Sequence, residues 1–224
     1  MAERPLFANT AGTARGAELS TNKVLRNTYM LLAMTLLFSA VTAGIGMALN
    51  LGMVGYLVCF VAAFAMLFVV HRTADSGKGL IAVFGFTGLM GLCLGPLLNT
   101  YLALPNGSGL VMQALGGTAL VFFSLSAYAL TTRKDFSFMG GFLMTGLIVV
   151  IVAAIANLFF QVPAVSLALS GAIVLIMSGL ILFDTSRIVN GGETNYIRAT
   201  VALYLNIYNL FTSMLHLLGV FGDD

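Results

Sequence analysis

Seven apolar runs, each long enough to cross a lipid bilayer as a helix, follow one another along this chain. A spanning helix needs about 20 apolar residues. The runs show no alternation of polar and apolar residues, which favours helices over a membrane β-barrel. They occupy residues 29–49, 52–70, 79–103, 109–131, 138–160, 164–185 and 197–219. The sequence therefore predicts an all-α membrane protein with seven transmembrane helices.

Composition agrees with this class and excludes others. The chain has 224 residues, of which 59% are hydrophobic and only 8% are charged, whereas about 25% are charged in a typical soluble domain. No basic run is interleaved with aromatic residues, so nucleic acid is not an expected partner. Cys59 and Cys93 stand alone in separate apolar runs, and this spacing gives neither a disulfide framework nor a metal site.

The positive charges predict how the chain sits in the membrane. Cytoplasmic loops are the ones enriched in Lys and Arg. Nine of the ten positive charges fall before the first run or in the connections after runs 2, 4 and 6, and the tenth, Arg198, lies at the start of run 7 beside the last connection. The ten are Arg4, Arg15, Lys23, Arg26, Arg72, Lys78, Arg133, Lys134, Arg187 and Arg198. We therefore expect a cytoplasmic N-terminus and a C-terminus on the outside. Residues 1–27 are polar and contain Pro5, Gly12 and Gly16, which predicts a flexible cytoplasmic tail before a single transmembrane domain at 28–224.

The last apolar run carries polar residues on one face. Residues three and four positions apart share a helix face, and the face of this run contains Ala199, Ala202, Asn206, Asn209, Ser213 and His216. A helix with such a stripe cannot face lipid broadly, so we expect it inside the bundle. The stripe either makes structural hydrogen bonds to neighbouring helices or lines a wet cavity.

Asp184 is the one carboxylate embedded in membrane-like sequence. A charge at such a position is rare and generally has a partner or a function. With a rise of about 1.5 Å per residue, Asp184 and Asn206 lie at similar depths from the same side, so contact between them is expected. Arg187 can pair with Asp184 at i,i+3, and Arg72 is a second candidate. The site is then either a proton- or ion-sensitive latch or a permanent clasp.

Catalysis is not expected. A serine protease needs a Ser beside a His, and Ser178 and His216 are predicted at different depths. An aspartyl protease needs two membrane carboxylates, and only Asp184 is present. No phosphate loop or dinucleotide fingerprint follows a strand.

The final forty residues resemble the signature of the Bax inhibitor-1 (TMBIM) family of membrane proteins. The matching segments are Phe183-Asp184-Thr185, Arg187-Ile188, Gly191-Gly192, Tyr196-Ile197, Ala202-Leu203-Tyr204-Leu205, Asn209-Leu210-Phe211 and Leu215-Leu218-Gly219, with Gly95-Pro96-Leu97-Leu98 similar to a third-helix motif. The resemblance implies six helices around a central seventh. It also implies two aspartates that latch a pH-sensitive calcium leak. Asp184 matches the first aspartate, but the second position is Asn206, which removes one hard anionic ligand for calcium.

Within the family the run Tyr204-Leu205-Asn206-Ile207-Tyr208-Asn209 is most similar to the YccA-type branch of bacterial inner membranes. That branch implies an interaction protein that binds and restrains the membrane-anchored ATP-dependent protease of the FtsH type, with its accessory membrane proteins, through the cytoplasmic tail. The alternative is a calcium or proton leak gated at Asp184. No cofactor is expected, apart from weak calcium binding for which Asp184 is the candidate ligand.

Overall fold

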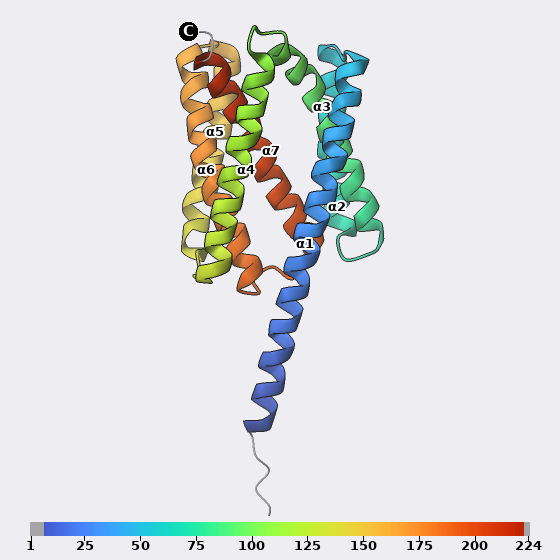
Figure 1. Cartoon of the computed structure of the whole chain (residues 1–224), viewed down its shortest axis with the longest axis vertical. Coiled ribbons are helices and arrows are strands. Elements are labelled where there is room, and N and C mark those ends of the chain that lie inside the picture. The colour runs from blue at the N-terminus through green and yellow to red at the C-terminus, as the bar shows by residue number, and fades with distance from the viewer. Residues whose placement is uncertain (1–6, 222–224) are drawn as a thin grey trace, which may run out of the picture.

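The computed structural model shows seven long helices in the described part of the chain, and no strand there (Figure 1). It describes the backbone of residues 7–221 and the side chains of residues 19–220. The charged residues Arg4, Asp223 and Asp224 therefore lie outside the described residues. The helices are α1 Phe7–Leu49, α2 Met53–Thr73, α3 Lys78–Leu102, α4 Gly107–Thr132, α5 Gly140–Phe160, α6 Pro163–Val189 and α7 Tyr196–Phe221, and the short 3₁₀ turn η1 Ser137–Met139 precedes α5. All seven contain a stretch long and apolar enough to cross a membrane, which confirms the predicted helix count.

The first helix is longer than the sequence pattern predicts. Residues 7–27, expected as part of a flexible tail, form a helical backbone that continues into the first span, while residues 1–6 of that tail lie outside the described residues. No proline follows Pro5 in this segment, and Ala, the strongest helix former, recurs in it. A helix nucleated in the membrane also propagates outward at little cost. In Figure 1, α1 extends well past the ends of the other helices.

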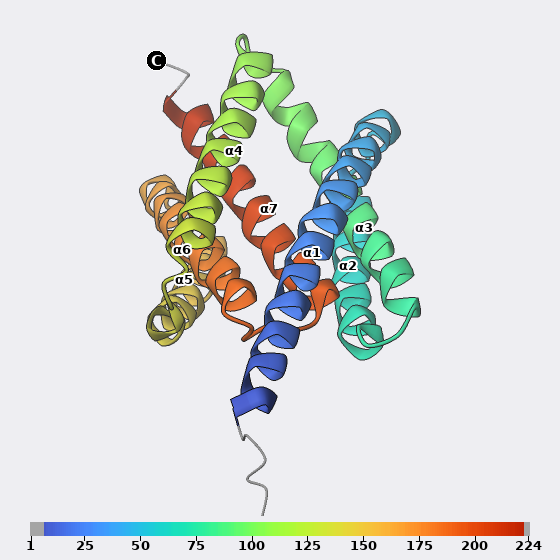
Figure 2. The same ribbon diagram turned by 60° about the horizontal axis from the view of Figure 1, so that its bottom comes forward.

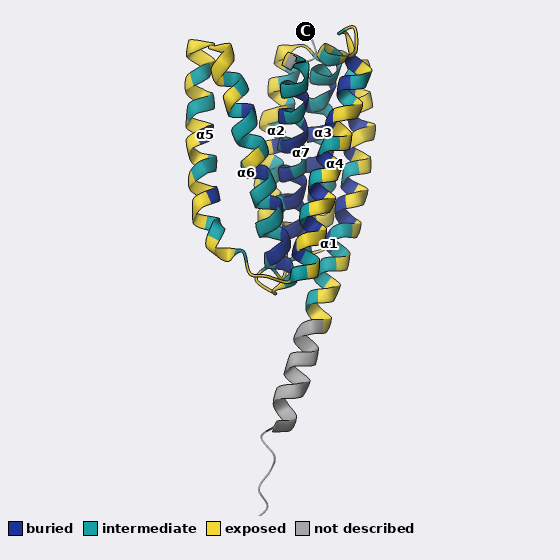
Figure 3. Cartoon of the chain, turned by 60° about the vertical axis from the view of Figure 1, so that its left-hand side comes forward, coloured by how far each residue is buried: buried dark blue, intermediate teal, exposed yellow. Residues whose placement is uncertain are grey.

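The polar-faced helix α7 lies at the centre of the bundle. It packs against α6, α4, α1, α3 and α2, and Figure 2 shows it crossing between α1 and α4. Its buried turns contrast with those of α5, which are mostly exposed (Figure 3). Among the spanning helices, the described part of α5 packs only on α6. The predicted central seventh helix is confirmed, with α5 as an outer helix rather than a direct neighbour of α7.

Close contact between α1 and α3 depends on glycine. A Cβ atom added at Gly95 would overlap the backbone of Gly46 and Met47, and one added at Gly91 would overlap Thr42 and the Ser39 carbonyl. Small residues let two membrane helices approach until their backbones touch. Gly91 and Gly95 are therefore part of an α1–α3 packing face.

The basic connections lie at one end of the bundle. Successive helices run in opposite directions, so the α2–α3, α4–α5 and α6–α7 connections meet at the end from which α1 projects (Figure 1). These connections and the helix turns beside them contain Arg72, Lys78, Arg133, Lys134, Arg187 and Arg198.

Candidate functional site

The membrane carboxylate and the central helix meet directly. Asn206 Nδ2 donates a hydrogen bond of 2.8 Å to Asp184 Oδ2. Asn206 is buried on α7, and Asp184 is half-buried near the last turns of α6. Hydrogen bonds that involve an ionised partner are stronger than neutral ones, so this contact holds α6 against α7. Its role as a gate remains a prediction.

Hydroxyl groups surround the next turn of α6. Thr185 is fully buried, and its Oγ1 lies 3.5 Å from Ser126 Oγ on α4. Ser186 Oγ donates to the Lys134 carbonyl at 2.9 Å and accepts from the Phe136 amide at 3.1 Å. The end of α6 that carries Asp184 is therefore tied to both α4 and the α4–α5 connection.

Arg187 pairs with Glu193 rather than with Asp184. Its Nη2 atom lies 3.7 Å from Glu193 Oε2 and donates to the Gly192 carbonyl at 3.5 Å. Its guanidinium also lies 5.6 Å from the centre of the Phe183 ring. Among the described side chains, no cation lies within 4 Å of the Asp184 carboxylate. The expected direct Asp184–Arg187 ion pair is therefore absent from this structure, because Arg187 is used to hold the α6–α7 connection.

Arg72 is not a partner of Asp184. Its guanidinium lies 4.7 Å from the centre of the Phe68 ring, and the residue is exposed at the end of α2. In the described structure α2 does not pack against α6, so the two side chains belong to different parts of the bundle. The proposed second arginine partner was wrong because sequence depth alone does not reveal which helices are neighbours.

The rest of the polar stripe has separate hydrogen-bonding roles. Asn209 Nδ2 donates to the Leu205 carbonyl of its own helix at 2.8 Å, and Ser213 is buried. His216 Nδ1 lies 2.8 Å from Ser170 Oγ on α6. Helices α6 and α7 are thus joined by side-chain hydrogen bonds near both of their ends, at Asp184–Asn206 and at Ser170–His216.

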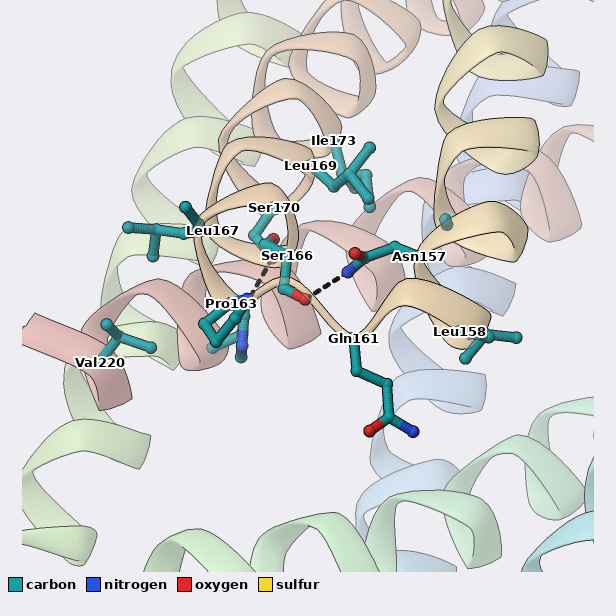
Figure 4. A pocket seen from close by; sticks show the side chains of 13 residues that line it. Asn157, Leu158, Gln161, Pro163, Ser166, Leu167, Leu169, Ser170, Ile173 and Val220 are labelled. Carbon is teal, nitrogen blue, oxygen red and sulfur yellow. Dashed lines mark hydrogen bonds between the residues drawn. The ribbon is translucent and has the colours of Figure 1, made fainter.

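A cavity of about 750 Å³ opens beside the Ser170–His216 contact, between α5, α6 and α7 (Figure 4). Asn157 and Ser166 form a 2.7 Å hydrogen bond across it. Its lining contains no acidic side chain, and His216 faces Ser170 through Nδ1. A catalytic triad instead needs a carboxylate to orient the histidine on the side opposite the serine. The pair therefore fits a structural contact. The sequence analysis had considered Ser178, whose hydroxyl bonds to the Val174 carbonyl of its own helix.

Tyr204, which the sequence marks only as part of the family signature, is a central residue of the structure. It is 1% exposed, and its hydroxyl lies 2.7 Å from Ser39 Oγ on α1. The same hydroxyl donates a hydrogen bond of 3.4 Å to the Thr87 carbonyl on α3, and the ring packs edge-on against Phe86. One phenol thus links three helices at the centre of the bundle.

Asn195 organises the charged end of the bundle and was not predicted. Its Oδ1 accepts from the amides of Ile197 and Arg198, at 2.9 and 3.1 Å, so it caps the start of α7. Its Nδ2 donates to the Ala74 carbonyl at 3.0 Å and to Asp75 Oδ1 at 2.8 Å. Arg198 joins the cluster through a 2.7 Å contact with Asp75. An Asn just before an apolar run is a helix-start signal that could have identified the cap.

The sequence of the whole helical bundle matches a known family profile. Residues 21–223 match Bax1-I, described as "Inhibitor of apoptosis-promoting Bax1". The chain belongs to the Bax inhibitor-1 family. The matched residues include both helices of the Asp184–Asn206 contact and all three helices that Tyr204 links.

Several relatives in the Bax inhibitor-1 family are similar over nearly their full length. A protein of Escherichia coli named "Modulator of FtsH protease YccA" is 53% identical over 210 residues, covering 94% of this chain and 95% of its own. A membrane protein of Vibrio cholerae is 52% identical over 221 residues, covering 98% of each chain. A protein of Campylobacter jejuni is 38% identical over 223 residues, covering 97% of this chain and 94% of its own.

This Bax inhibitor-1 family chain pairs one carboxylate with one amide between α6 and α7. The two-aspartate arrangement implied by the family resemblance would place two acids in hydrogen-bond contact. Here the Asn206 amide supplies a donor that cannot ionise. The arrangement can hold an ionised Asp184 in place without sharing a proton.

Proposed function

We propose that the chain modulates a membrane-anchored ATP-dependent protease of the FtsH type by binding to it. The observation that carries this proposal is the 53% identity, over 94% of the chain, to the Escherichia coli protein named a modulator of that protease.

The proposed orientation places the N-terminus in the cytoplasm and the C-terminus outside, in a bacterial inner membrane. A relative that is 53% identical is named an inner membrane protein. The three basic connections share one end of the bundle with the projecting part of α1 (Figure 1). Short loops rich in Lys and Arg remain on the cytoplasmic side, which supports this direction.

The projecting part of α1 is the proposed contact for the protease. The helix has 43 residues and so measures roughly 65 Å, about twice the roughly 30 Å thickness of the hydrocarbon core. Its first half therefore reaches beyond the membrane at the basic end of the bundle. In the proposed orientation this half of α1 lies on the cytoplasmic side, where an ATP-dependent protease would meet it.

The test uses the full-length protein and the purified protease reconstituted in the same vesicles. We expect the protein to co-purify with the protease and to slow degradation of a membrane substrate. Deletion of residues 2–18, which leaves the spanning part of α1 from Leu19, should weaken this effect. A second variant replaces residues 2–18 with an unrelated helical sequence of equal length. It shows whether inhibition depends on the sequence of this segment or only on its length. Failure of the full-length protein to bind would refute the function, and full inhibition by the deletion variant would refute the role of α1.

A calcium or proton leak gated at Asp184 is the less supported function. Calcium takes six to eight oxygen ligands, and the contact offers one carboxylate and one amide. Among the described residues, no group of three His, Cys, Asp or Glu side chains is placed to hold a metal ion. Calcium flux into vesicles that contain the protein, compared with empty vesicles, distinguishes the two functions.

A further inference from the structure

Helices α1 and α4 both pack on α7, but in the described structure their backbones stay apart, and their rings meet where Tyr29 lies 6.0 Å from Phe122. Between them lies a cavity of about 460 Å³, with α7 as its floor and α3 at one end. Figure 2 shows α1 and α4 on opposite sides of α7. The α7 residues on the floor of this cavity are therefore accessible from between α1 and α4.

The lining is apolar, and its polar groups are nearly all satisfied. The α1 wall has small residues at Ala40 and Gly44, and the α4 wall has the aromatic rings of Phe122 and Phe123. The polar groups are Ser39, Thr118, Tyr204 and Tyr208. Ser39 bonds to Tyr204, and Thr118 donates to the Ala114 carbonyl. Only the Tyr208 hydroxyl lacks a hydrogen bond to another described residue. A water molecule needs two to four polar partners, so this lining does not favour water.

The length of the cavity matches one leaflet of a bilayer. Its lining on α1 runs from Leu36 to Met47, which at about 1.5 Å per residue is roughly 16 Å. Half of the hydrocarbon core is about 15 Å thick. Leu36 lies near the middle of the first span, and Met47 lies close to its end at the α1–α2 connection. The cavity therefore extends from mid-membrane to one surface.

Volume and charge both restrict the occupant. A spanning helix about 10 Å wide and 30 Å long occupies on the order of 2,000 Å³, several times the 460 Å³ of this cavity. The lining contains no charged side chain, so charge complementarity excludes an ion or a charged headgroup. An uncharged, narrow and flexible chain about one leaflet long meets both conditions.

We propose that this cavity holds one acyl chain of a membrane phospholipid, from the leaflet on the side of the α1–α2 connection. The chain lies against Tyr208 and Ile207 of α7, between the small residues of α1 and the rings of α4. The lipid headgroup stays at the membrane surface near Met47. The bound chain fills the space between α1 and α4 from Leu36 to Met47, beyond the contact of Tyr29 with Phe122.

The experiment uses the full-length protein in vesicles of phosphatidylethanolamine and phosphatidylglycerol that include a phospholipid with a photoreactive diazirine in one acyl chain. After irradiation, labelled residues are mapped by mass spectrometry. We expect label on Ile207 and Tyr208 of α7, which line the cavity. Label on the exposed Phe142 of α5 measures ordinary lipid contact.

Two matched glycine variants test the site. A Cβ atom at Gly44 or at Gly116 would meet nothing within 4 Å, but only Gly44 lines the cavity. We expect Gly44→Leu to fill the cavity and remove most of the α7 label, while Gly116→Leu retains it. Ala40→Leu should repeat the loss from a second position, and Tyr208→Phe should retain the label because the cavity fits the chain by shape. A cooperative thermal unfolding transition, with a midpoint no lower than that of the parent protein, shows that each variant is folded.

The proposal would be overturned if the parent protein were labelled on α5 but not on α7. It would also be overturned if Gly44→Leu left the labelling of α7 unchanged. A photoreactive residue in place of Ile207 tests the other occupant. Its cross-linking to a second protein in native membranes, with none to lipid, would assign the cavity to a partner helix and would also refute the acyl chain.

Discussion

Asn206 on α7 donates a 2.8 Å hydrogen bond to the Asp184 carboxylate on α6, and within the described side chains no cation pairs with that carboxylate. The Asp184 site is therefore a helix–helix contact built from one acid and one amide. Its donor comes from the central helix, so loss of the contact affects the packing of α6 on the core of the bundle.

Removal of the donor should destabilise the protein. Asn206→Ala leaves the Asp184 carboxylate without its hydrogen bond, and interhelical hydrogen bonds in membranes contribute about 0.6 kcal/mol on average and up to about 1.7. We expect a lower midpoint of thermal unfolding in detergent. Asn209→Ala is the matched control, because the Asn209 amide bonds only within its own helix. Equal effects of the two variants would show that the α6–α7 contact contributes nothing of its own.

A second carboxylate at this contact should be unfavourable. Asn206→Asp would place two acids at hydrogen-bond distance, and like charges that share a site repel. We expect Asn206→Asp to lower the unfolding temperature at neutral pH more than Asp184→Asn, which keeps the size of the side chain and removes the charge. The calcium flux of vesicles containing Asn206→Asp, measured beside the parent protein, shows whether a second acid creates a leak.

The glycine contact between α1 and α3 should tolerate no added methyl group. Gly95→Ala would force a Cβ atom into the backbone of Gly46 and Met47. Overpacking of this kind typically lowers the free energy of unfolding by about 1–3 kcal/mol. Gly116→Ala adds the same methyl group on α4 where nothing lies within 4 Å, and it should stabilise the helix by about 0.5–1 kcal/mol. Thermal unfolding of both variants tests this difference in sign. A Gly95→Ala protein as stable as the parent would contradict the close approach.

The cap at the start of α7 should matter more than the ion pair beside it. Asn195→Ala removes the cap, for which the typical loss is about 1 kcal/mol, together with the bonds to the α2–α3 connection. Arg198→Ala removes an exposed ion pair with Asp75, and such pairs contribute roughly 0–1 kcal/mol. Unfolding of the two variants at low and high salt distinguishes them, since only the effect of Arg198→Ala should shrink with salt. The reverse order of stabilities would refute the role of Asn195 as a cap.

Cysteine labelling tests the orientation. Ser76 in the α2–α3 connection and Ser108 near the start of α4 are exposed at opposite ends of the bundle. In a background with Cys59→Ala and Cys93→Ala, a membrane-impermeant thiol reagent added to intact spheroplasts should label Ser108→Cys and not Ser76→Cys. Permeabilised membranes should give label at both positions. Label at Ser76→Cys in intact cells would reverse the proposed topology.

The sequence predicted the seven helices and the central position of α7, because hydrophobic length and polar periodicity are local properties. It also brought Asp184 and Asn206 to similar depths through the constant helical rise. Depth gives no information on lateral position, however. The prediction of Arg72 as a partner of Asp184 is therefore wrong, because α2 does not pack against α6 in the described structure. Arg187 was near enough in sequence, but Glu193 in the following connection competes for its guanidinium.

The contacts that were missed depend on which helix faces which. Tyr204 meets Ser39 and Thr87 only because α1, α3 and α7 converge, and its spacing along α7 resembles that of any buried aromatic residue. The continuation of α1 through residues 7–27 was missed for a different reason. Polar composition was taken to indicate a flexible segment, although alanine content and an adjoining helix favour continued helical structure.

The unbroken course of α1 gives it a mechanical property. A helix resists axial stretching far better than an irregular segment, so a pull on its free end reaches the membrane with little slack. The load is then carried where Gly46 and Gly95 bring two backbones together and where Ser39 holds Tyr204. An enzyme that pulls on the projecting part of α1 would therefore work directly against these contacts between helices.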